Sequence, residues 1–310
     1  MSNSPKVSKA TKLARLKHNI PLYLMFLPGA LYLLINNYIP MGGLIIAFKQ
    51  VNWNKGILKS PWVGLSNFEY LFKTKEAWNI TRNTLGYNII FIVLGTVIAI
   101  AIAILLNEIK VMAMKKTYQT IILLPYLISM VVVSYLVYAL LSSESGFINL
   151  SILRPLGKPE IAWYTEPKYW PAILIIVYIW KTFGYNCILY YATLVGIDRG
   201  YYEAAVIDGA SRWKQTIYIT LPELSSTIVV LLILRLGQIM NVGYEKTILM
   251  YSPATYDTAD VIASYVYRVG IIDADYGYST AINFFNSIVN FIVLFVANTI
   301  SRKLSETSLW

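Results

Sequence analysis

The sequence predicts an all-α polytopic membrane protein with six transmembrane helices. Of its 310 residues, 57% are hydrophobic and 14% are charged, whereas about a quarter of the residues in a soluble domain are charged. The mean hydropathy is +0.55. The apolar residues also form long blocks, such as 85–106 and 121–141, each close to the roughly 20 residues that cross the hydrocarbon core of a bilayer. The chain is therefore expected to reside in lipid.

The formal net charge of +10 has three possible explanations: nucleic acid, an acidic membrane surface, or the enrichment of Lys and Arg in cytoplasmic loops. The third explanation requires no partner, and we expect no nucleic-acid partner. The chain has one cysteine, Cys187, and one histidine, His18. These residues cannot form a disulfide framework or a Cys/His metal site within the chain, so we predict no metal site.

The N-terminus combines basic residues with a following apolar run, as a signal peptide does. The basic residues are Lys6, Lys9, Lys12, Arg15 and Lys17. However, the apolar run extends from Leu22 towards Phe48, beyond the roughly 7 to 15 residues of a signal sequence, and no small-residue cleavage site follows it. We therefore predict a basic cytoplasmic segment, 1–21, followed by a retained membrane anchor.

Six apolar segments are candidate transmembrane helices, and together they define one membrane domain, 22–301. They lie at about 22–48, 81–106, 117–141, 170–197, 224–242 and 280–301. The first contains Asn36, Asn37 and Pro40, so a tilted helix followed by an interfacial segment fits it equally well. Pro125 and Gly184 could allow kinks in the third and fourth segments, and simple packing defects are equally plausible.

An even number of spans places both termini on the same side of the membrane. Lys110, Lys115 and Lys116, the loop 199–222 and the basic pair Arg302 and Lys303 would then share the cytoplasmic face, as the positive-inside rule expects. The segment 302–310 becomes a cytoplasmic tail. We expect a multi-pass protein of the cell membrane with both termini in the cytoplasm.

The loop 199–222 is too amphipathic for a simple connection. Glu203, Ala204 and Ala205 favour a helix, and Gly209 is placed to supply the left-handed conformation that ends one. Ser211 can cap a second short helix that runs towards Pro222. The two helices would form a compact knob. It could receive mechanical input from a soluble partner, or it could be an ordinary amphipathic interfacial helix.

The segment Glu203-Ala204-Ala205, followed by Asp208-Gly209-Ala210 and later by Leu221-Pro222, resembles the EAA signature of MalF/MetI-like permeases of binding-protein-dependent ABC importers. The resemblance implies a MetI-like, type I importer core and a coupling loop at 199–222 that docks into a cleft of the ATPase subunit. It implies ATPase-coupling roles for Glu203, Ala204, Ala205, Asp208 and Gly209. The sequence departs from the signature at Thr216, where an aromatic residue is frequent, and at Ser226, where a proline is.

Further segments resemble the LplB-like permeases for oligosaccharides derived from polysaccharides, a group typical of Gram-positive bacteria. They are residues 38–43, 83–85, 124–129, 265–268 and 298–303. The resemblance implies a second homologous permease, homodimeric or paired ABC ATPase subunits and an extracellular lipid-anchored sugar-binding protein as partners. The sequence has no phosphate-binding loop G-x-x-x-x-G-K-[ST]. We therefore expect ATP and Mg²⁺ on the partner ATPase, no cofactor on this chain and no catalytic residue.

Polar residues within the spans are candidates for sugar contact, because such residues usually face a cavity or another helix. They are Trp180, Lys181, Tyr185, Asn186, Arg235, Gln238, Asn241, Glu245, Asn283 and Asn286. We expect those from Arg235 to Glu245 to form a stripe along one helix face. Aromatic rings and hydrogen-bonding groups together suit a sugar. Hydrogen bonds between helices and interfacial aromatic belts are the alternative.

Two other functions stay open. An ion-coupled secondary transporter could use Lys181, Arg235 and Glu245, but it is expected to show internal repeats, and none is evident. A membrane enzyme acting on lipid-linked sugars needs convergent acid and base groups or metal ligands. The external segment 244–277 contains the one acidic cluster, with Asp257, Asp260, Asp273 and Asp275. The same segment is a candidate docking surface for a sugar-binding protein.

Overall fold

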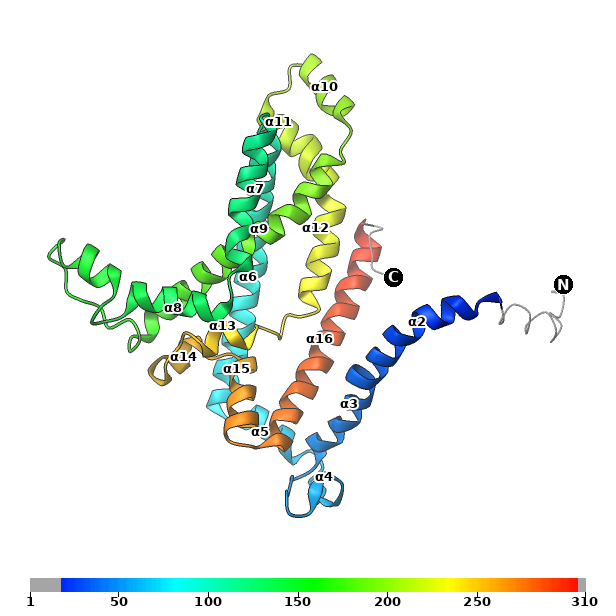
Figure 1. Cartoon of the computed structure of the whole chain (residues 1–310), viewed down its shortest axis with the longest axis vertical. Coiled ribbons are helices and arrows are strands. Elements are labelled where there is room, and N and C mark those ends of the chain that lie inside the picture. The colour runs from blue at the N-terminus through cyan, green and yellow to red at the C-terminus, as the bar shows by residue number, and fades with distance from the viewer. Residues whose placement is uncertain (1–17, 306–310) are drawn as a thin grey trace.

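The computed structural model describes residues 18–305, and these residues form helices joined by loops (Figure 1). The basic residues at positions 6–17 and the end of the predicted tail, 306–310, lie outside the described residues. Within residues 18–305, five helical segments are long and apolar enough to cross a membrane, and a bent pair of helices makes a sixth if it is counted as one span. The predicted polytopic α-helical fold is confirmed.

The first segment is helical throughout, in four consecutive parts. They are α2 (Ile20–Leu33), the π-helical turn η1 (Leu34–Tyr38), α3 (Ile39–Met41) and the 3₁₀ helix η2 (Gly42–Phe48). Asn36 is accommodated within the helix, since its side chain donates to the Tyr32 carbonyl at 3.0 Å. No residue of α2 is buried, and α2 extends away from the other helices (Figure 1). Only η2, at the far end, packs against the last helix.

Helix α6 (Lys75–Glu108) is the central element, and it follows the short helices α4 (Gly56–Lys59) and α5 (Ser66–Lys73). The Thr74 side chain caps it by accepting from the Ala77 amide at 3.2 Å. Gly95, Ala99 and Ala103 are buried at intervals of four on one face of α6. Small residues at this spacing let two membrane helices approach closely, and the main partner of α6 is α9 (Trp170–Val195).

Two helices occupy the predicted span 117–141, and the chain breaks just after Pro125, where the sequence allowed a kink. Helix α7 (Met112–Leu127) and helix α8 (Met130–Leu141) are bent by 91° relative to each other. The chain becomes extended at Ile128 and Ser129, just beyond Pro125, and the Ser129 hydroxyl accepts from the Val132 amide at 3.4 Å. The bend is therefore stabilised by a new helix cap on its far side.

Gly184 does not kink the fourth span, which is one helix, α9. A Cβ atom at Gly184 would lie 1.8 Å from the carbonyl oxygen of Ile122, so glycine is required here because α7 and α9 approach backbone to backbone. Between α8 and α9 the chain forms the turns η3 (Ile148–Leu153) and η4 (Pro167–Tyr169). The sequence left a kink or a packing defect at Gly184 equally plausible, and the structure has a close helix contact there instead.

The predicted fifth span, 224–242, ends earlier than expected. Helix α12 (Leu221–Leu236) stops before Gly237, and residues 237–243 form turns and irregular chain. The predicted stripe along one helix face is therefore wrong, because Arg235 lies in the last turn of α12 and Gln238, Asn241 and Glu245 lie beyond it.

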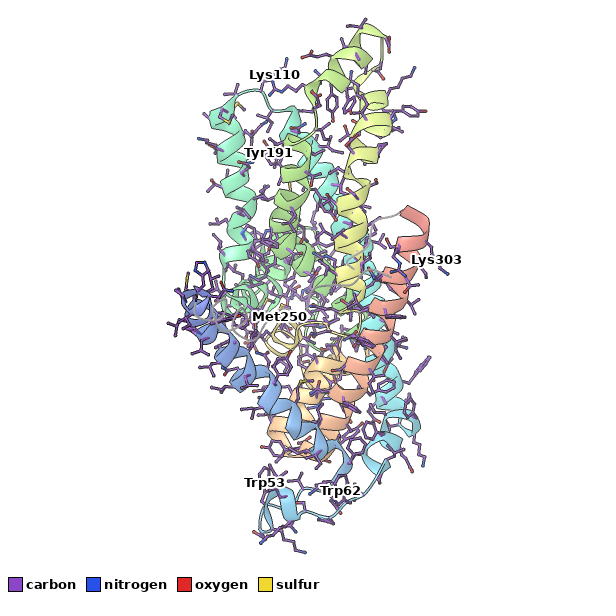
Figure 2. All side chains as sticks on the ribbon, turned by 90° about the vertical axis from the view of Figure 1, so that its right-hand side faces the viewer. Trp53, Trp62, Lys110, Tyr191, Met250 and Lys303 are labelled. Carbon is purple, nitrogen blue, oxygen red and sulfur yellow. The ribbon has the colours of Figure 1, made fainter. Side chains whose placement is uncertain are left out.

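Short helices follow α12 and lead to the last span. They are α13 (Tyr244–Ile248), η6 (Pro253–Thr255), α14 (Tyr256–Ala259), α15 (Ile262–Tyr267) and η7 (Arg268–Ile272), and the last span is α16 (Tyr276–Ser305). Lys110 lies near one end of the molecule and Trp53 and Trp62 near the other (Figure 2). The first helix of the predicted knob, α10 (Arg199–Ile207), lies at the same end of the molecule as the start of α7 (Figure 1).

Candidate functional site

Helix α10 and the turn after it form the first part of the candidate site. The Asp198 carboxylate caps α10 by accepting from the Gly200 amide at 2.9 Å. Gly209 has a φ of +74°, which ends α10 at low energetic cost because glycine has no Cβ. The Ala210 amide then returns to the Ala205 carbonyl at 2.8 Å. The helix and the glycine turn expected from the sequence are present, whereas the Asp198 cap was not predicted.

The second part of the knob is α11 (Arg212–Gln215), which continues through the π-helical turn η5 (Thr216–Thr220) into α12. The Ser211 side chain caps α11 at the Lys214 amide, at 3.4 Å. Gln215 is buried and donates to the Ala210 carbonyl at 2.9 Å. The Tyr202 hydroxyl contacts the Thr220 hydroxyl at 3.0 Å and joins α10 to the start of α12. The knob is thus held firmly to α12.

The outer surface of the knob is apolar and open. Ile207 is 86% exposed, Trp213 71% and Tyr218 74%. A groove of about 320 Å³ crosses this surface. Its lining residues are Tyr201, Ala204, Ala205, Asp208, Tyr218, Ile219, Pro222 and Glu223. Of the predicted coupling residues, Ala204, Ala205 and Asp208 line the groove, and Glu203 and Gly209 are exposed beside it. Apolar patches of this kind mark interaction surfaces.

Lys181 anchors the bend between α7 and α8. Its ammonium group donates to the carbonyls of Pro125 and Tyr126, each at 3.3 Å, and to that of Ile128. These carbonyls lie at the C-terminal end of α7, where no helical partner is available and the helix dipole is negative. The predicted sugar-contacting residue Lys181 therefore also has a structural role that sequence reasoning missed.

An aromatic pair lies beside Lys181. The rings of Tyr185 and Tyr126 are stacked, with centroids 4.6 Å apart and planes inclined by 11°. Both side chains are exposed, as is Trp180. Tyr126 was not among the predicted contact residues, although it belongs to the segment 124–129 that carries the family resemblance.

Arg235 connects α12 to α9. Its guanidinium donates to the Asn186 side-chain oxygen at 2.6 Å and to the Tyr178 hydroxyl at 3.1 Å. Asn186 is buried, whereas Gln238, Asn241 and Glu245 are exposed. The structure brings Arg235 and Asn186 into contact but does not place the other three residues in that network.

The polar residues of α16 face different surroundings. Asn283 is exposed, and Asn286 is buried with no hydrogen-bond partner for its Oδ1 among the described residues. The Asn290 Oδ1 accepts from the Met240 amide at 3.0 Å, which fixes the irregular chain after α12. The contact between Asn290 and Met240 therefore serves packing, while the Asn283 side chain is exposed.

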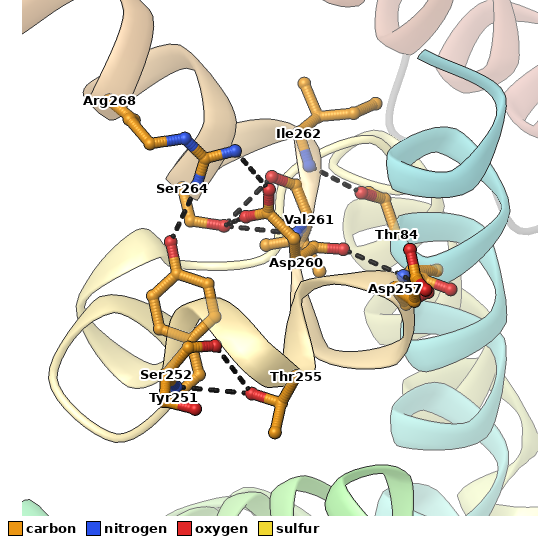
Figure 3. A network of polar contacts seen from close by, with 11 residues as sticks. Thr84, Tyr251, Ser252, Thr255, Asp257, Asp260, Val261, Ile262, Ser264 and Arg268 are labelled. Atoms are coloured by element: carbon orange, nitrogen blue, oxygen red, sulfur yellow. Dashed lines mark hydrogen bonds and ion pairs between the residues drawn. The ribbon is translucent and has the colours of Figure 1, made fainter. Parts of the chain in front are cut away.

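The segment 244–277 is a folded platform, and Figure 3 shows the polar network within it and its contact with Thr84. Arg268 pairs with the buried carboxylate of Asp260 at 2.6 Å, and the Ser264 hydroxyl donates to the same carboxylate at 2.6 Å. The Thr84 hydroxyl of α6 accepts from the Ile262 amide at 2.9 Å, and Asn83 donates to the Asp260 carbonyl at 3.0 Å. Residues from two of the motifs that carry the resemblance thus hold this platform on α6.

Tyr251 completes the buried side of this network. The Arg268 guanidinium donates to its hydroxyl at 3.1 Å. Burial removes water from this phenol and raises the pKa of Tyr251 above its ordinary value, and the neighbouring Asp260 carboxylate raises the pKa further. The phenol therefore stays neutral at physiological pH, and Asp260 supplies the negative charge that balances Arg268.

Residues 92–306 match the sequence family described as the binding-protein-dependent transport system inner membrane component. The match covers more than half of the chain. The chain belongs to this family. It is therefore a membrane-spanning permease of the ABC transporter type, and its homologues are transport subunits.

Individual relatives cover almost the whole permease. Protein LplB of Bacillus subtilis is 36% identical over 298 residues, which are 96% of this chain and 93% of LplB. The polygalacturonan/rhamnogalacturonan transport system permease protein YteP of the same bacterium is 36% identical over 289 residues, 93% of this chain and 90% of YteP.

Solved structures agree with this assignment. A chain of a bacterial ABC transporter that imports the acidic polysaccharide alginate aligns with a TM-score of 0.87 and 38% identity, over 94% of this permease and 99% of that chain. A second structure shows an alginate transporter with its periplasmic protein bound to an alginate pentasaccharide, with a TM-score of 0.87 and 37% identity. The alignment with this second structure covers 96% of this permease and 99% of the aligned transporter chain.

Proposed function

We propose that this permease imports oligosaccharides released from polysaccharides and forms half of a translocation path with a second, related permease. A separate pair of ATPase subunits would supply the energy through the coupling loop 199–222. Support for the substrate class comes from the relatives, whose names refer to polygalacturonan, rhamnogalacturonan and alginate. In this arrangement the chain itself catalyses no reaction.

The observation that carries the proposal is the knob of α10 and α11. Its groove is lined by the small side chains of Ala204 and Ala205 and also by the carboxylates of Asp208 and Glu223, so the backbone of a partner can approach closely at the alanines. The knob is tied to α12 through the Tyr202–Thr220 contact and to the end of α6 through the Arg212–Glu108 ion pair, at 3.2 Å. A force applied to the knob would therefore reach two spanning helices. The sequence has no phosphate-binding loop. This absence supports ATP hydrolysis by a subunit on another chain.

The aromatic pair Tyr126–Tyr185 and the exposed ring of Trp180 support a sugar as the transported molecule. The C–H faces of a pyranose pack on aromatic rings, while its hydroxyls require hydrogen-bonding groups. Gln238 and Asn241 are exposed and supply both donors and acceptors. We propose that the folded external platform 244–277 receives an extracellular, lipid-anchored sugar-binding protein, with both termini of the permease in the cytoplasm.

Charge reversal at the knob tests the proposal. The tagged permease is expressed with the genes that neighbour its own, and wild type is compared with Glu203→Lys and with the control Glu144→Lys. Glu144 is an exposed carboxylate between α8 and α9, in the part of the chain that we assign to the outside. We expect wild type and the control to co-purify an ATPase and a second permease, and to show ATP hydrolysis stimulated by sugar-loaded binding protein. Glu203→Lys should lose this stimulation.

Two results would contradict the proposal. The first is a permease that purifies alone and still transports sugar in vesicles without ATP, as a secondary transporter does. The second is equal loss of stimulation in Glu203→Lys and Glu144→Lys, which would indicate a general effect of charge reversal. Membrane abundance of each variant, measured by immunoblot, separates loss of coupling from loss of the protein.

A further inference from the structure

A pocket of about 230 Å³ lies between α5, the start of α6, α15 and α16. Ala77, Ile80 and Ile262 line it and are buried. Phe72 and Trp78 line it as well, and these two side chains are 70% and 68% exposed. A water molecule takes up about 30 Å³ in the liquid. The pocket therefore has room for a group of many atoms, which can enter between the two exposed rings.

The pocket lies near the boundary of the membrane. Its residues on α6 immediately precede the predicted start of the second span at residue 81, and those on α16 follow the predicted start of the last span at residue 280. Exposed tryptophans such as Trp78 are typical of this level, where headgroups meet acyl chains. Helices α5 and α15 lie at the end opposite to α10 (Figure 1). The pocket is therefore at the boundary that we assign to the outer leaflet.

The pocket contains an unsatisfied polar group. Asn286 lines it, is only 9% exposed, and has no hydrogen-bond partner for its Oδ1 among the described residues. A buried acceptor without a partner is unfavourable. The terminal torsion of asparagine is broad, so a small rotation of the amide can present its oxygen to the pocket. A molecule that donates a hydrogen bond to Asn286 would remove this cost.

A second acceptor lies on α6. The Thr81 hydroxyl donates to the Ala77 carbonyl at 2.7 Å, and its oxygen can still accept a hydrogen bond. Thr81 also lines the pocket. The pocket thus combines two acceptors with apolar and aromatic walls. This combination suits a molecule that has hydroxyl groups at one end and hydrocarbon at the other.

The N-terminal end of α6 opens onto the same pocket, since Thr74 caps the helix and lines the pocket. The first amides of a helix have no intrahelical partner, and the helix dipole is positive there, which favours a phosphate. Of the nearby carboxylates, Glu69 pairs with Lys73 at 2.6 Å. Glu76 and Lys75 are both exposed and have opposite charges. The side-chain charges therefore balance, and the dipole alone favours an anion.

We propose that this pocket binds a membrane lipid whose headgroup carries free hydroxyl groups, with phosphatidylglycerol as the probe. The hydroxyls of the headgroup donate to Asn286 and Thr81, the phosphate lies at the start of α6, and the hydrocarbon follows the aromatic wall. Phe72 and Phe285 form part of this wall and pack edge to face, with ring centroids 5.4 Å apart. The bound lipid holds α5, α6 and α16 together at their outer ends. This role does not depend on the molecule that the permease transports.

Competition between two lipids of equal charge tests the proposal. The full-length permease, with the subunits that co-purify with it, is placed in nanodiscs of phosphatidylcholine that contain equal amounts of phosphatidylglycerol and phosphatidylmethanol. The two anionic lipids have the same acyl chains, and only phosphatidylglycerol has headgroup hydroxyls. Native mass spectrometry then counts the lipids that stay bound after release from the nanodisc. We expect phosphatidylglycerol to be retained over phosphatidylmethanol by about tenfold, as one added buried hydrogen bond predicts.

Variants locate the selectivity. Asn286→Leu should bring the ratio of the two retained lipids to one, and Thr81→Val should lower it. The matched control is Asn283→Leu, because Asn283 lies one turn earlier on α16 and is exposed; its ratio should equal that of wild type. Without added lipid, Asn286→Leu should unfold in detergent at the same temperature as wild type or higher, because it removes an unsatisfied group. If Asn286→Leu does not fold, the ratio in Thr81→Val decides.

The proposal is overturned if wild type retains the two lipids equally, or if Asn283→Leu lowers the ratio as much as Asn286→Leu does. Retention of neither lipid would also overturn it and would indicate that another protein chain covers the pocket. Displacement of phosphatidylglycerol by a soluble oligosaccharide would assign the pocket to a sugar instead of a lipid. In each of these cases the proposed import of oligosaccharides is tested separately, by the coupling experiment at the knob.

Discussion

Gly184 is the residue at which two spanning helices meet backbone to backbone. A methyl group there would lie 1.8 Å from the Ile122 carbonyl oxygen and 2.5 Å from its carbon. Gly184→Ala should therefore force α7 and α9 apart. Overpacked side chains cost about 1–3 kcal/mol, and a clash with backbone should reach at least the upper end of that range. Thermal unfolding in detergent, followed by size-exclusion chromatography, measures the effect.

Gly86→Ala in α6 is the matched control for this substitution. No heavy atom lies within 4 Å of the position where its Cβ would be, and alanine favours a helix over glycine by about 1 kcal/mol. Gly86→Ala should unfold at the same temperature as wild type or higher. Equal unfolding temperatures for Gly184→Ala and wild type would show that α7 and α9 are farther apart than the structure places them.

Arg268 is the second residue with a large predicted effect. Its partner Asp260 has a side chain only 4% exposed, so Arg268→Met leaves a buried carboxylate without a counter-charge. Removal of one partner of a buried ion pair costs about 3–5 kcal/mol. We expect a correspondingly lower thermal stability of the solubilised protein.

The double variant Arg268→Met/Asp260→Asn tests the cause of that loss. It removes both charges, so it should recover part of the stability lost in Arg268→Met. If the double variant is less stable than the single variant, the ion pair is not the source of the loss, and the packing of Arg268 on Tyr256, 4.2 Å from the ring centroid, becomes the better explanation.

At the scale of elements, the knob depends on the turn between α10 and α11. Gly209 has a positive φ, and any other L-residue except Asn or Asp pays roughly 1–2 kcal/mol there. Gly209→Val should therefore distort the knob and uncouple ATP hydrolysis from the binding protein, without removing the permease from the membrane. Gly209→Asn should retain coupling, because Asn tolerates this conformation. Sugar-stimulated ATPase activity of the purified complex provides the measurement.

The knob could be predicted from the sequence because its signals are local. Ser211 caps the helix that follows it, and Gly209 ends the helix before it; both residues act within one turn of their own position. Pro125 indicated a possible kink in the third segment, but the 91° break after Leu127 could not be predicted from local signals alone. It depends on Lys181, which lies far along the chain and binds the carbonyls that the bend leaves free.

The early end of α12 has a similar explanation. Hydrophobic pattern alone continues through residues 237–242, but the irregular chain there is held by the Asn290 side chain of α16 at the Met240 amide. The polar candidates from Arg235 to Glu245 were therefore wrongly placed on one helix face. Tyr126 was missed for the same reason, because its stacking on Tyr185 depends on how α7 and α9 are paired.

At the scale of the whole molecule, the orientation in the membrane can be tested with thiols. Cys187 is the one native cysteine and is buried, so a Cys187→Ala background provides a clean reference. We introduce Asn54→Cys near Trp53 at one end of the molecule and Ile207→Cys on the knob; both positions are exposed. A membrane-impermeant maleimide should label Asn54→Cys in intact cells and label Ile207→Cys only after permeabilisation.

The reverse labelling pattern would place the knob outside the cell and would contradict ATPase coupling. Labelling of both sites in intact cells would indicate leaky membranes. The control for leakage is a cytoplasmic protein with a known thiol, which should stay unlabelled in intact cells. The basic residues at the knob end, including Lys110, Lys115 and Lys116, support the expected result, because Lys and Arg accumulate on the cytoplasmic side.

The exposed apolar surface of the knob also bears on how a cell must produce this protein. Ile207, Trp213 and Tyr218 project from the end of the bundle that we assign to the aqueous cytoplasm, and apolar patches in water promote aggregation. A permease synthesised in excess of the ATPase subunits would leave this surface uncovered, and an uncovered apolar surface marks an incompletely assembled complex. We therefore expect quality-control proteases to clear the surplus chain, so that the supply of ATPase subunits sets the number of importers in the membrane.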